Sequence, residues 1–508
     1  MSRKQGSYGQ ILKTSSIIGG AQGINYLIGM FRTKLLAVLL GPAGIGLVGL
    51  YSSITTMVAA FAGLGIGSSG VRDVAEAAVH GGDEQVGKIV KTLRRVCWGT
   101  GIFGWLLMAV FSRPLSLWIF QSPVHAWTIA ALGVTVLAGE ITMGQMVFIQ
   151  GMRRISDLAR VNIFSMVSGT LIAVGIYAWQ GEKGILPVLV LTAIVNLVFS
   201  SWYAKKITIP EVSLTLRETW MQLRSLLKMG TAFMWSGLLT TAVVFATRTM
   251  IVKTLGLDAN GIYQAAWGIS GMFAGFILGA MGTDFFPRLT AVASDHSEVN
   301  RLVNEQTEVG ILLALPGILG TLSFAPLLMR IFYSSQFLPA AELLPWFVLG
   351  VFGRVVSWPM GFILLAKGMS KWFVISETLA AIIQLSLTYI FLHWLGLRGV
   401  AVAFAILYFV FTFGTSVAVG RLTNFRWSPA SVRLLVGSSL LVAAGFFIQS
   451  NLKNTFGIAL GGGLTLASGI YCLRGIAERL GPQHRVLSAL KRVPFLSRLC
   501  LGKSFGNL

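Results

Sequence analysis

The chain has 508 residues, of which 55% are hydrophobic and only 11% are charged, and its mean hydropathy is +0.75. A soluble domain carries about 25% charged residues, so this composition excludes an ordinary soluble globular protein. The net charge of +22 comes from 40 Lys and Arg residues against 18 Asp and Glu residues. Because these basic residues lie in short segments between apolar runs, they indicate the positive-inside bias of membrane proteins and disfavour a nucleic-acid-binding face.

Apolar runs of roughly 20 residues recur along the chain, and each can cross about 30 Å of hydrocarbon as a helix. We therefore predict an all-α polytopic membrane protein with about 14 transmembrane helices. A β-barrel is excluded, because its short strands would alternate polar and apolar residues. In chain order the predicted helices cover residues 9–31, 44–70, 90–111, 125–149, 159–179, 185–204, 229–254, 261–283, 307–329, 343–365, 372–394, 398–420, 432–450 and 455–475.

Two stretches of the sequence, about 216 residues apart, carry nearly the same pattern. The matching positions are Arg32 and Arg248, Gly41 and Gly256, Gly46 and Gly261, and Arg72 and Arg288. A repeat of this length indicates two copies of one module. Each module holds an even number of predicted helices, so both insert with the same orientation. Repeated bundles of this kind are the usual scaffold of secondary transporters.

The repeat divides the chain into five predicted parts. They are an N-terminal six-helix bundle at 1–206, a cytoplasmic linker at 207–228, a C-terminal six-helix bundle at 229–425, an extra helix pair at 426–480 and a basic cytoplasmic tail at 481–508. Most Lys and Arg residues fall in the N-terminal segment, in alternate loops, in the linker and in the tail. This asymmetry predicts that both chain ends lie in the cytoplasm.

Ionisable side chains inside membrane spans are costly, and each is therefore a candidate for function. The basic candidates are Arg32, Lys34, Arg248, Lys253 and Arg354, and the acidic candidates are Glu140, Asp284 and Glu377. Arg32 and Arg248 match each other in the repeat. We predict that they face a central cavity from both modules and hold a phosphate or pyrophosphate through bidentate hydrogen bonds.

Each candidate also has a structural alternative. Arg32 and Lys34 can instead extend along their aliphatic stems to the outer membrane interface. Glu140 and Glu377 can each neutralise a nearby cation, or they can bind a coupling ion. Asp284 can pair along the helix face with Arg288, four residues later.

Motifs for a cofactor, a metal or a nucleotide are missing from the sequence. Gly65–Gly70 matches GxGxxG, but it ends a membrane helix and no strand precedes it, so it does not indicate dinucleotide binding. No P-loop occurs, and the three cysteines lack metal-ligand spacing. We therefore expect no cofactor, no metal and no direct use of ATP.

Three segments resemble the O-antigen translocases known as Wzx-type polysaccharide flippases. They are Arg32–Gly46, Phe285–Leu289 and Leu364–Lys371, and the resemblance covers roughly residues 8–425. The superfamily of these flippases also holds multidrug-and-toxin extruders and the lipid II flippase. The resemblance implies a multi-pass protein of the bacterial inner membrane that moves undecaprenyl-pyrophosphate-linked oligosaccharide from the cytoplasmic to the periplasmic leaflet by alternating access. It also implies that Arg32 lines the cavity.

The same resemblance names the expected partners. They are the lipid-linked oligosaccharide and membrane lipids, with a polysaccharide polymerase and chain-length proteins as further candidates and a proton or sodium ion as the candidate coupling ion. Two alternatives stay open. One is an ion-coupled exporter of drugs or small cations, which the excess of basic over acidic groups in the spans disfavours. The other is a membrane-embedded polyprenyl-dependent glycosyltransferase or polymerase, which would want catalytic residues on a large outer loop.

Overall fold

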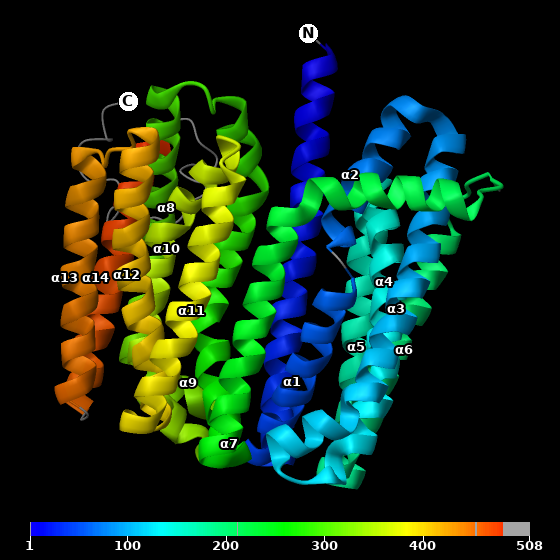
Figure 1. The fold of residues 1–508 in the computed structure, drawn as a ribbon. Helices are drawn as coiled ribbons and strands as arrows, with labels where there is room; N and C mark the ends of the chain where they lie inside the picture. Colours follow the sequence, from blue (N-terminus) through cyan, green and yellow to red (C-terminus); the bar gives the residue numbers. More distant parts are fainter. Residues whose placement is uncertain (1, 64, 211, 453–454, 481–508) are drawn as a thin grey trace. The chain divides into compact units, whose positions relative to one another are not determined.

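The computed structural model describes residues 2–63, 65–210, 212–452 and 455–480. Over these residues the chain is helical and has no β-strand (Figure 1). Eleven segments of the described chain are long and apolar enough to cross a membrane. The predicted all-α polytopic membrane fold is therefore confirmed. The predicted number of about 14 transmembrane helices is not confirmed, because the described residues give eleven candidate spans.

Two very long helices bend at matching glycines of the repeat. Helix α1 (Ser2–Ala62) bends at Gly41, where φ is 62° and ψ is −172°. Helix α7 (Leu216–Ala291) bends at Gly256, where φ is 87° and ψ is −179°. A positive φ is strained for any side chain with a Cβ atom, so glycine is the residue that permits each bend. The predicted helices 9–31 and 44–70 thus meet at residue 41 with no loop between them.

The described chain forms two compact units, and the boundary between them falls inside α7. Unit 1 comprises the described residues up to Gly261 together with Phe332–Ser334, and unit 2 comprises Ile262–Ile331 and the described residues from Ser335 onward. The five predicted parts of the chain remain predictions, with one difference in detail. Part of the predicted linker at 207–228 is helical, because α7 already begins at Leu216.

Unit 1 is built around α4 (Ala126–Gly151). Its other elements are α1, α2 (Ile66–Glu76), the π-helix η1 (Ala77–Gly81), α3 (Gly82–Phe120), the 3₁₀ turn η2 (Pro123–His125), α5 (Ile155–Gln180), η3 (Gly181–Gly184), α6 (Ile185–Lys205) and the first part of α7. Helix α4 packs against α3, α6 and α2, while α1 packs chiefly against α5. Gly101 and Gly104 of α3 face Leu137 and Val136 of α4, so small residues let these two helices approach closely.

The predicted helix 44–70 is broken in the structure. Helix α1 ends at Ala62, and α2 begins at Ile66 after Gly65, which has a φ of 69°. The segment between the predicted helices 44–70 and 90–111 is also helical, and it consists of the end of α2, η1 and the first turns of α3. The sequence did not predict this break, because the apolar run continues through it and hydropathy carries no information on backbone conformation.

The segment after α6 is attached to α3 by hydrogen bonds. Lys91 donates to the carbonyl oxygen of Val212 at 2.5 Å. Arg95 donates to the carbonyl oxygen of Leu214 at 2.9 Å and to the hydroxyl of Thr219 at 2.9 Å. These contacts make the predicted linker part of unit 1, and they place the start of α7 beside α3.

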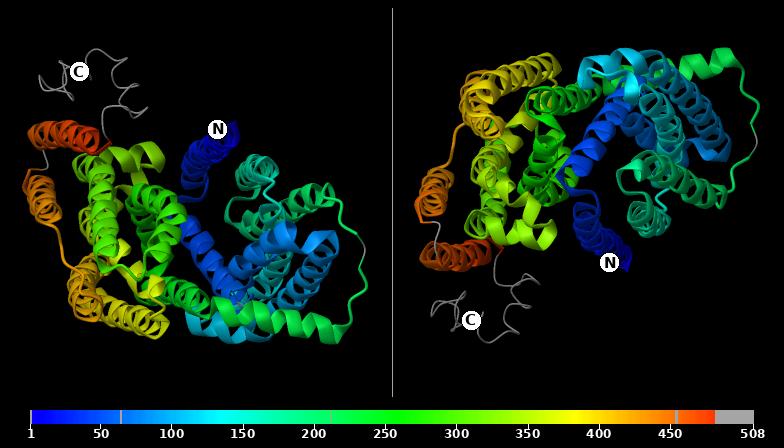
Figure 2. Two further views of the ribbon diagram at one scale, coloured as in Figure 1. Left: turned by 90° about the horizontal axis from the view of Figure 1, so that it is seen from above. Right: turned by 90° about the horizontal axis from the view of Figure 1, so that it is seen from below.

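Unit 2 contains the rest of α7 and all later helices. These are α8 (His296–Ser323), α9 (Ala325–Phe332), η4 (Ser335–Glu342), α10 (Leu344–Ala366), α11 (Ser370–Leu395), α12 (Leu397–Thr423), α13 (Pro429–Asn451) and α14 (Thr455–Leu480). Helix α10 packs against α8 and α12, and α11 packs against α12. The extra pair, α13 and α14, stands side by side along α8, as Figure 2 shows in orange and red.

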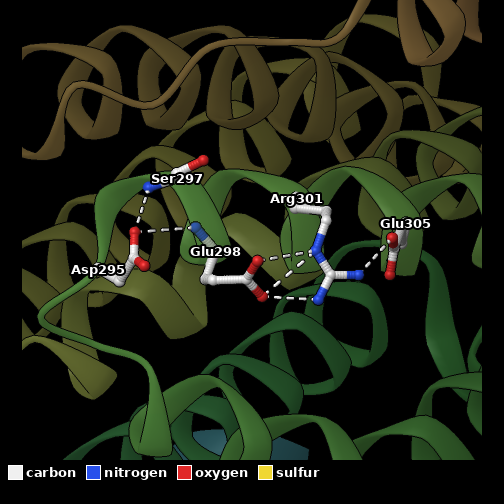
Figure 3. Close-up of polar contacts among 5 residues, drawn as sticks. All are labelled: Asp295, Ser297, Glu298, Arg301 and Glu305. Carbon is white, nitrogen blue, oxygen red and sulfur yellow. Dashed lines mark hydrogen bonds and ion pairs between the residues drawn. The ribbon is translucent and has the colours of Figure 1, made fainter.

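The first turns of α8 carry a polar network (Figure 3). Asp295 caps the helix by accepting hydrogen bonds from the amides of Ser297 at 2.9 Å and Glu298 at 3.2 Å. The guanidinium of Arg301 lies 2.6 Å from Glu298 and 2.8 Å from Glu305. These ion pairs are solvent-exposed, so they contribute little to stability, and the cap is the stronger reason for the helix to begin here.

Buried polar groups of α8 hold the start of α13. The side chain of Asn304 accepts a hydrogen bond from the amide of Ser428 at 2.8 Å and donates to the carbonyl oxygen of Arg426 at 3.0 Å. The carboxylate of Glu308 accepts a hydrogen bond from the hydroxyl of Ser431 at 2.7 Å. The extra helix pair is thus an integral part of unit 2.

Candidate functional site

Two side chains of α7 hold the backbone of α1 just beyond its bend. The side chain of Arg248 is buried, and its Nη1 donates to the carbonyl oxygen of Gly49. The side chain of Asn260 is fully buried, and its Nδ2 donates to the carbonyl oxygen of Gly46 at 2.7 Å. Both acceptors lie in the segment that follows Gly41, so this part of α1 is bound to α7 by two side chains.

Two matching glycines of the repeat, Gly46 of α1 and Gly261 of α7, lie where these two helices pack against each other. A methyl group on Gly46 would overlap the carbonyl oxygen of Leu257 and lie 2.9 Å from the amide nitrogen of Gly261. A methyl group on Gly261 would overlap the carbonyl oxygen of Pro42 and lie 3.0 Å from its Cα. The contact is reciprocal. Gly46 of α1 meets the backbone just after the bend of α7, and Gly261 of α7 meets the backbone just after the bend of α1. Only glycine at both positions lets the two backbones approach this closely.

The other basic candidates of unit 1 point to different partners. Arg32 is half-buried on the face of α1 that packs on α5, and it interacts electrostatically with Tyr177. Lys34 donates a hydrogen bond to the carbonyl oxygen of Tyr333. Lys253 is exposed, and its Nζ lies 5.1 Å from the ring centroid of Trp118, which is a cation–π contact. All four of these basic candidates thus lie in candidate membrane spans of unit 1, Leu27–Ala62 and Met234–Met272.

Glu140 is the acidic candidate of unit 1, and it is 4% exposed. Its Oε2 accepts a hydrogen bond of 3.3 Å from the hydroxyl of Thr100. A methyl group on Gly63 would lie 2.9 Å from both of its carboxyl oxygens. In the described part of the chain no Lys or Arg lies within ion-pair distance of this carboxyl group. The alternative that Glu140 neutralises a nearby cation is thus unsupported.

Two of the three candidates of unit 2 interact electrostatically with the same tyrosine. Arg354 is exposed on α10, and Glu377 is half-buried on α11. Both interact electrostatically with Tyr408 of α12. Asp284 lies in α7, but its side chain falls outside the described residues.

Sequence analysis missed several residues of these groups. Asn260 stands directly before the repeated Gly261, and an amide side chain next to a repeated glycine was a signal for it. Thr100 and Tyr408 carried no sequence signal, because their roles depend on helix contacts. Among the described residues no group of three or more His, Cys, Asp and Glu side chains could hold a metal ion.

Comparisons with known proteins relate this geometry to a family. A family model described as "polysaccharide biosynthesis protein" matches residues 35–342. The lipid III flippase of Escherichia coli (strain K12) is 24% identical over 401 residues, which cover 75% of this chain and 92% of that protein.

Two groups of solved structures share the fold. The lipid II flippase MurJ in an inward closed conformation gives a TM-score of 0.66 at 14% identity, and the match covers 89% of this chain and 97% of that one. An inward-facing multidrug resistance transporter of the MATE family, in the MOP superfamily, gives a TM-score of 0.62 at 16% identity, covering 83% of this chain and 95% of that one. At these identities the likeness concerns the fold.

Proposed function

We propose that this chain, which belongs to the polysaccharide biosynthesis protein family, is a flippase for a lipid-linked oligosaccharide in the bacterial inner membrane. The observation that carries the proposal is the set of basic side chains within the apolar helices of unit 1. They are the candidates Arg32, Lys34, Arg248 and Lys253, which lie in the spans Leu27–Ala62 and Met234–Met272. The similarity to a lipid III flippase over most of both chains supports the same function.

The physical task explains why basic groups inside spans suit this function. A sugar headgroup on a pyrophosphate is large, polar and anionic, and it cannot enter hydrocarbon unaided. Guanidinium groups hold such oxygens through paired, charge-assisted hydrogen bonds. The oligosaccharide therefore travels along a protein path with its pyrophosphate on Arg32 and Arg248, while the polyprenyl chain stays in lipid. Lys34 and Lys253 add positive charge along the path.

Alternating access of the two repeated bundles completes the proposed mechanism. The lipid is an undecaprenyl pyrophosphate, it enters from the cytoplasmic leaflet, and both chain ends face the cytoplasm. In the conformation described here Arg248 is held by the carbonyl oxygen of Gly49. Arg248 becomes available to the pyrophosphate when α1 and α7 separate at the reciprocal glycine contact.

Complementation of a deletion strain tests the proposal. We expect the intact chain to restore surface polysaccharide, and Arg32→Ala and Arg248→Ala to lower it at matched protein levels. Arg94→Ala is the control, because Arg94 is an exposed arginine of α3 and should not affect export. Unaltered export in both cavity variants would refute the role of the arginines. Drug sensitivity with normal surface polysaccharide in the deletion strain would instead favour the exporter alternative.

A further inference from the structure

The surroundings of Glu140 disfavour its charged form. The carboxyl group is buried inside an apolar helix, and a neutral hydroxyl, that of Thr100, is its hydrogen-bond donor among the described residues. A carboxylate in such a place lacks both water and a countercharge, which is costly inside a membrane. A protonated carboxyl group is neutral and tolerates the same burial.

The end of α1 adds to this preference. Helix α1 ends beside Glu140, and its last turn is closed by a hydrogen bond of 2.7 Å from the amide of Gly63 to the carbonyl oxygen of Ala59. A methyl group on Gly63 would lie 2.9 Å from Ala59 O and 2.9 Å from both carboxyl oxygens of Glu140. The final carbonyls of a helix carry its partial negative charge. They repel a carboxylate, whereas a protonated carboxyl group offers them a donor.

The neighbouring helices supply no compensating charge. Helix α4 packs against α1, α2, α3, α5 and α6, and the titratable group that interacts electrostatically with Glu140 is the buried thiol of Cys97 on α3. In the described part of the chain, α1, α2, α5 and α6 bring no charged side chain into contact with it. A hard metal cation needs more oxygen ligands than one carboxyl group and one hydroxyl provide, since calcium takes about 6–8.

We propose that Glu140 is a proton-binding site that controls the break between α1 and α2. With the proton bound, the carboxyl group packs against Gly63 and holds the end of α1 on α4. Loss of the proton to water leaves a carboxylate, which must be hydrated, so the break moves away from α4 and water enters. The proton site itself does not depend on the proposed function. Only the further step, in which this proton is the coupling ion of transport, rests on that function.

Infrared spectroscopy of the protein in lipid vesicles tests the protonation state directly. We expect a carbonyl stretching band of a protonated carboxyl group at neutral pH, and we expect Glu140→Gln to remove it. Glu182→Gln is the matched control, because Glu182 is exposed between α5 and α6 and should leave the band unchanged. The same band at neutral pH in Glu140→Gln, or its absence from the intact chain, would overturn the proposal.

Labelling of the Cys97 thiol reports movement of the break between α1 and α2. Cys97 is only 2% exposed, so a reagent reaches it when water enters. In a background of Cys472→Ser and Cys500→Ser, N-ethylmaleimide labels only this thiol. The thiol itself titrates in both proteins, but only the Glu140 protein can also lose the carboxyl proton. We therefore expect labelling to show a several-fold step with pH in the Glu140 protein that is missing from Glu140→Gln. Identical pH profiles in the two proteins would overturn the proposal.

A second variant tests the site independently, in case Glu140→Gln does not fold. Thr100→Val removes the hydrogen bond to the carboxylate, so the rise in Cys97 labelling should move upward by about one pH unit. A midpoint that stays in place would count against the site. Both readouts concern the protein alone. A chain that passes them and moves no lipid therefore refutes the proposed function, whereas a working flippase that fails them refutes the proton site.

Discussion

The reciprocal glycine contact between α1 and α7 makes a quantitative prediction. Gly261→Ala places a methyl group onto the carbonyl oxygen of Pro42, and Gly46→Ala places one onto the carbonyl oxygen of Leu257. In both cases the obstacle is backbone, which cannot rotate away as a side chain would. Each variant must therefore push α1 and α7 apart.

The expected size of the effect follows from two opposing terms. Overpacking a tight contact costs about 1–3 kcal/mol, and replacing a helical glycine by alanine returns about 0.5–1 kcal/mol. We expect each variant to be less stable by about 1–2 kcal/mol. The double variant should lose less than the sum of the two, because the first methyl group already separates the segments that the second would strike.

Gly237→Ala is the matched control on the same helix. Gly237 is exposed, and nothing lies within 4 Å of a methyl group at this position. The assay is thermal and denaturant unfolding of the purified proteins in one detergent. The close contact would be refuted if Gly46→Ala and Gly261→Ala were as stable as Gly237→Ala. Strict additivity in the double variant would show that the two glycines do not share one contact.

Three further outcomes are expected from the same structure. Asn260→Ala should lower stability by about 1–3 kcal/mol in the same unfolding assay, because it removes the donor to a buried carbonyl. Asn304→Ala should loosen the start of α13, so that limited proteolysis cuts the segment between α12 and α13 faster than in the intact protein. The amide of Thr215 binds the carboxylate of Glu218 and lowers the pKa of Glu218. This contribution is present above the ordinary pKa of a glutamate and is lost as the pH falls through the lowered value, so protection of the Thr215 amide from hydrogen exchange should weaken on acidification and disappear in Glu218→Ala.

The fold class and the repeat were predictable because both depend on composition and spacing. The matching glycines Gly41 and Gly256 predicted equivalent places in the two modules, and both have a positive φ in the structure. The resemblance to Wzx-type flippases is confirmed by the family match and by the shared fold. Helix ends were less predictable. Arg32 and Lys34 suggested the end of the first helix, but α1 continues past them to its bend at Gly41.

The candidate site was predictable only as a set of residue types. Charge inside a span singled out Arg248, but its hydrogen bond to Gly49 links residues 199 positions apart and depends on the packing of α1 against α7. Burial of Glu140 likewise depends on the end of α1 and on Thr100 of α3. The roles of Arg32, Arg248 and Arg354 in holding a substrate remain predictions.

Transbilayer movement in vesicles tests the central claim most directly. The purified chain is placed in liposomes that contain a fluorescent polyprenyl-pyrophosphate oligosaccharide, and a membrane-impermeant quencher reports which leaflet holds the headgroup. We predict that the chain makes the inner-leaflet pool accessible, and that Arg32→Ala slows this exchange at equal protein content. Exchange no faster than in protein-free liposomes, with a correctly folded and inserted chain, would contradict the account.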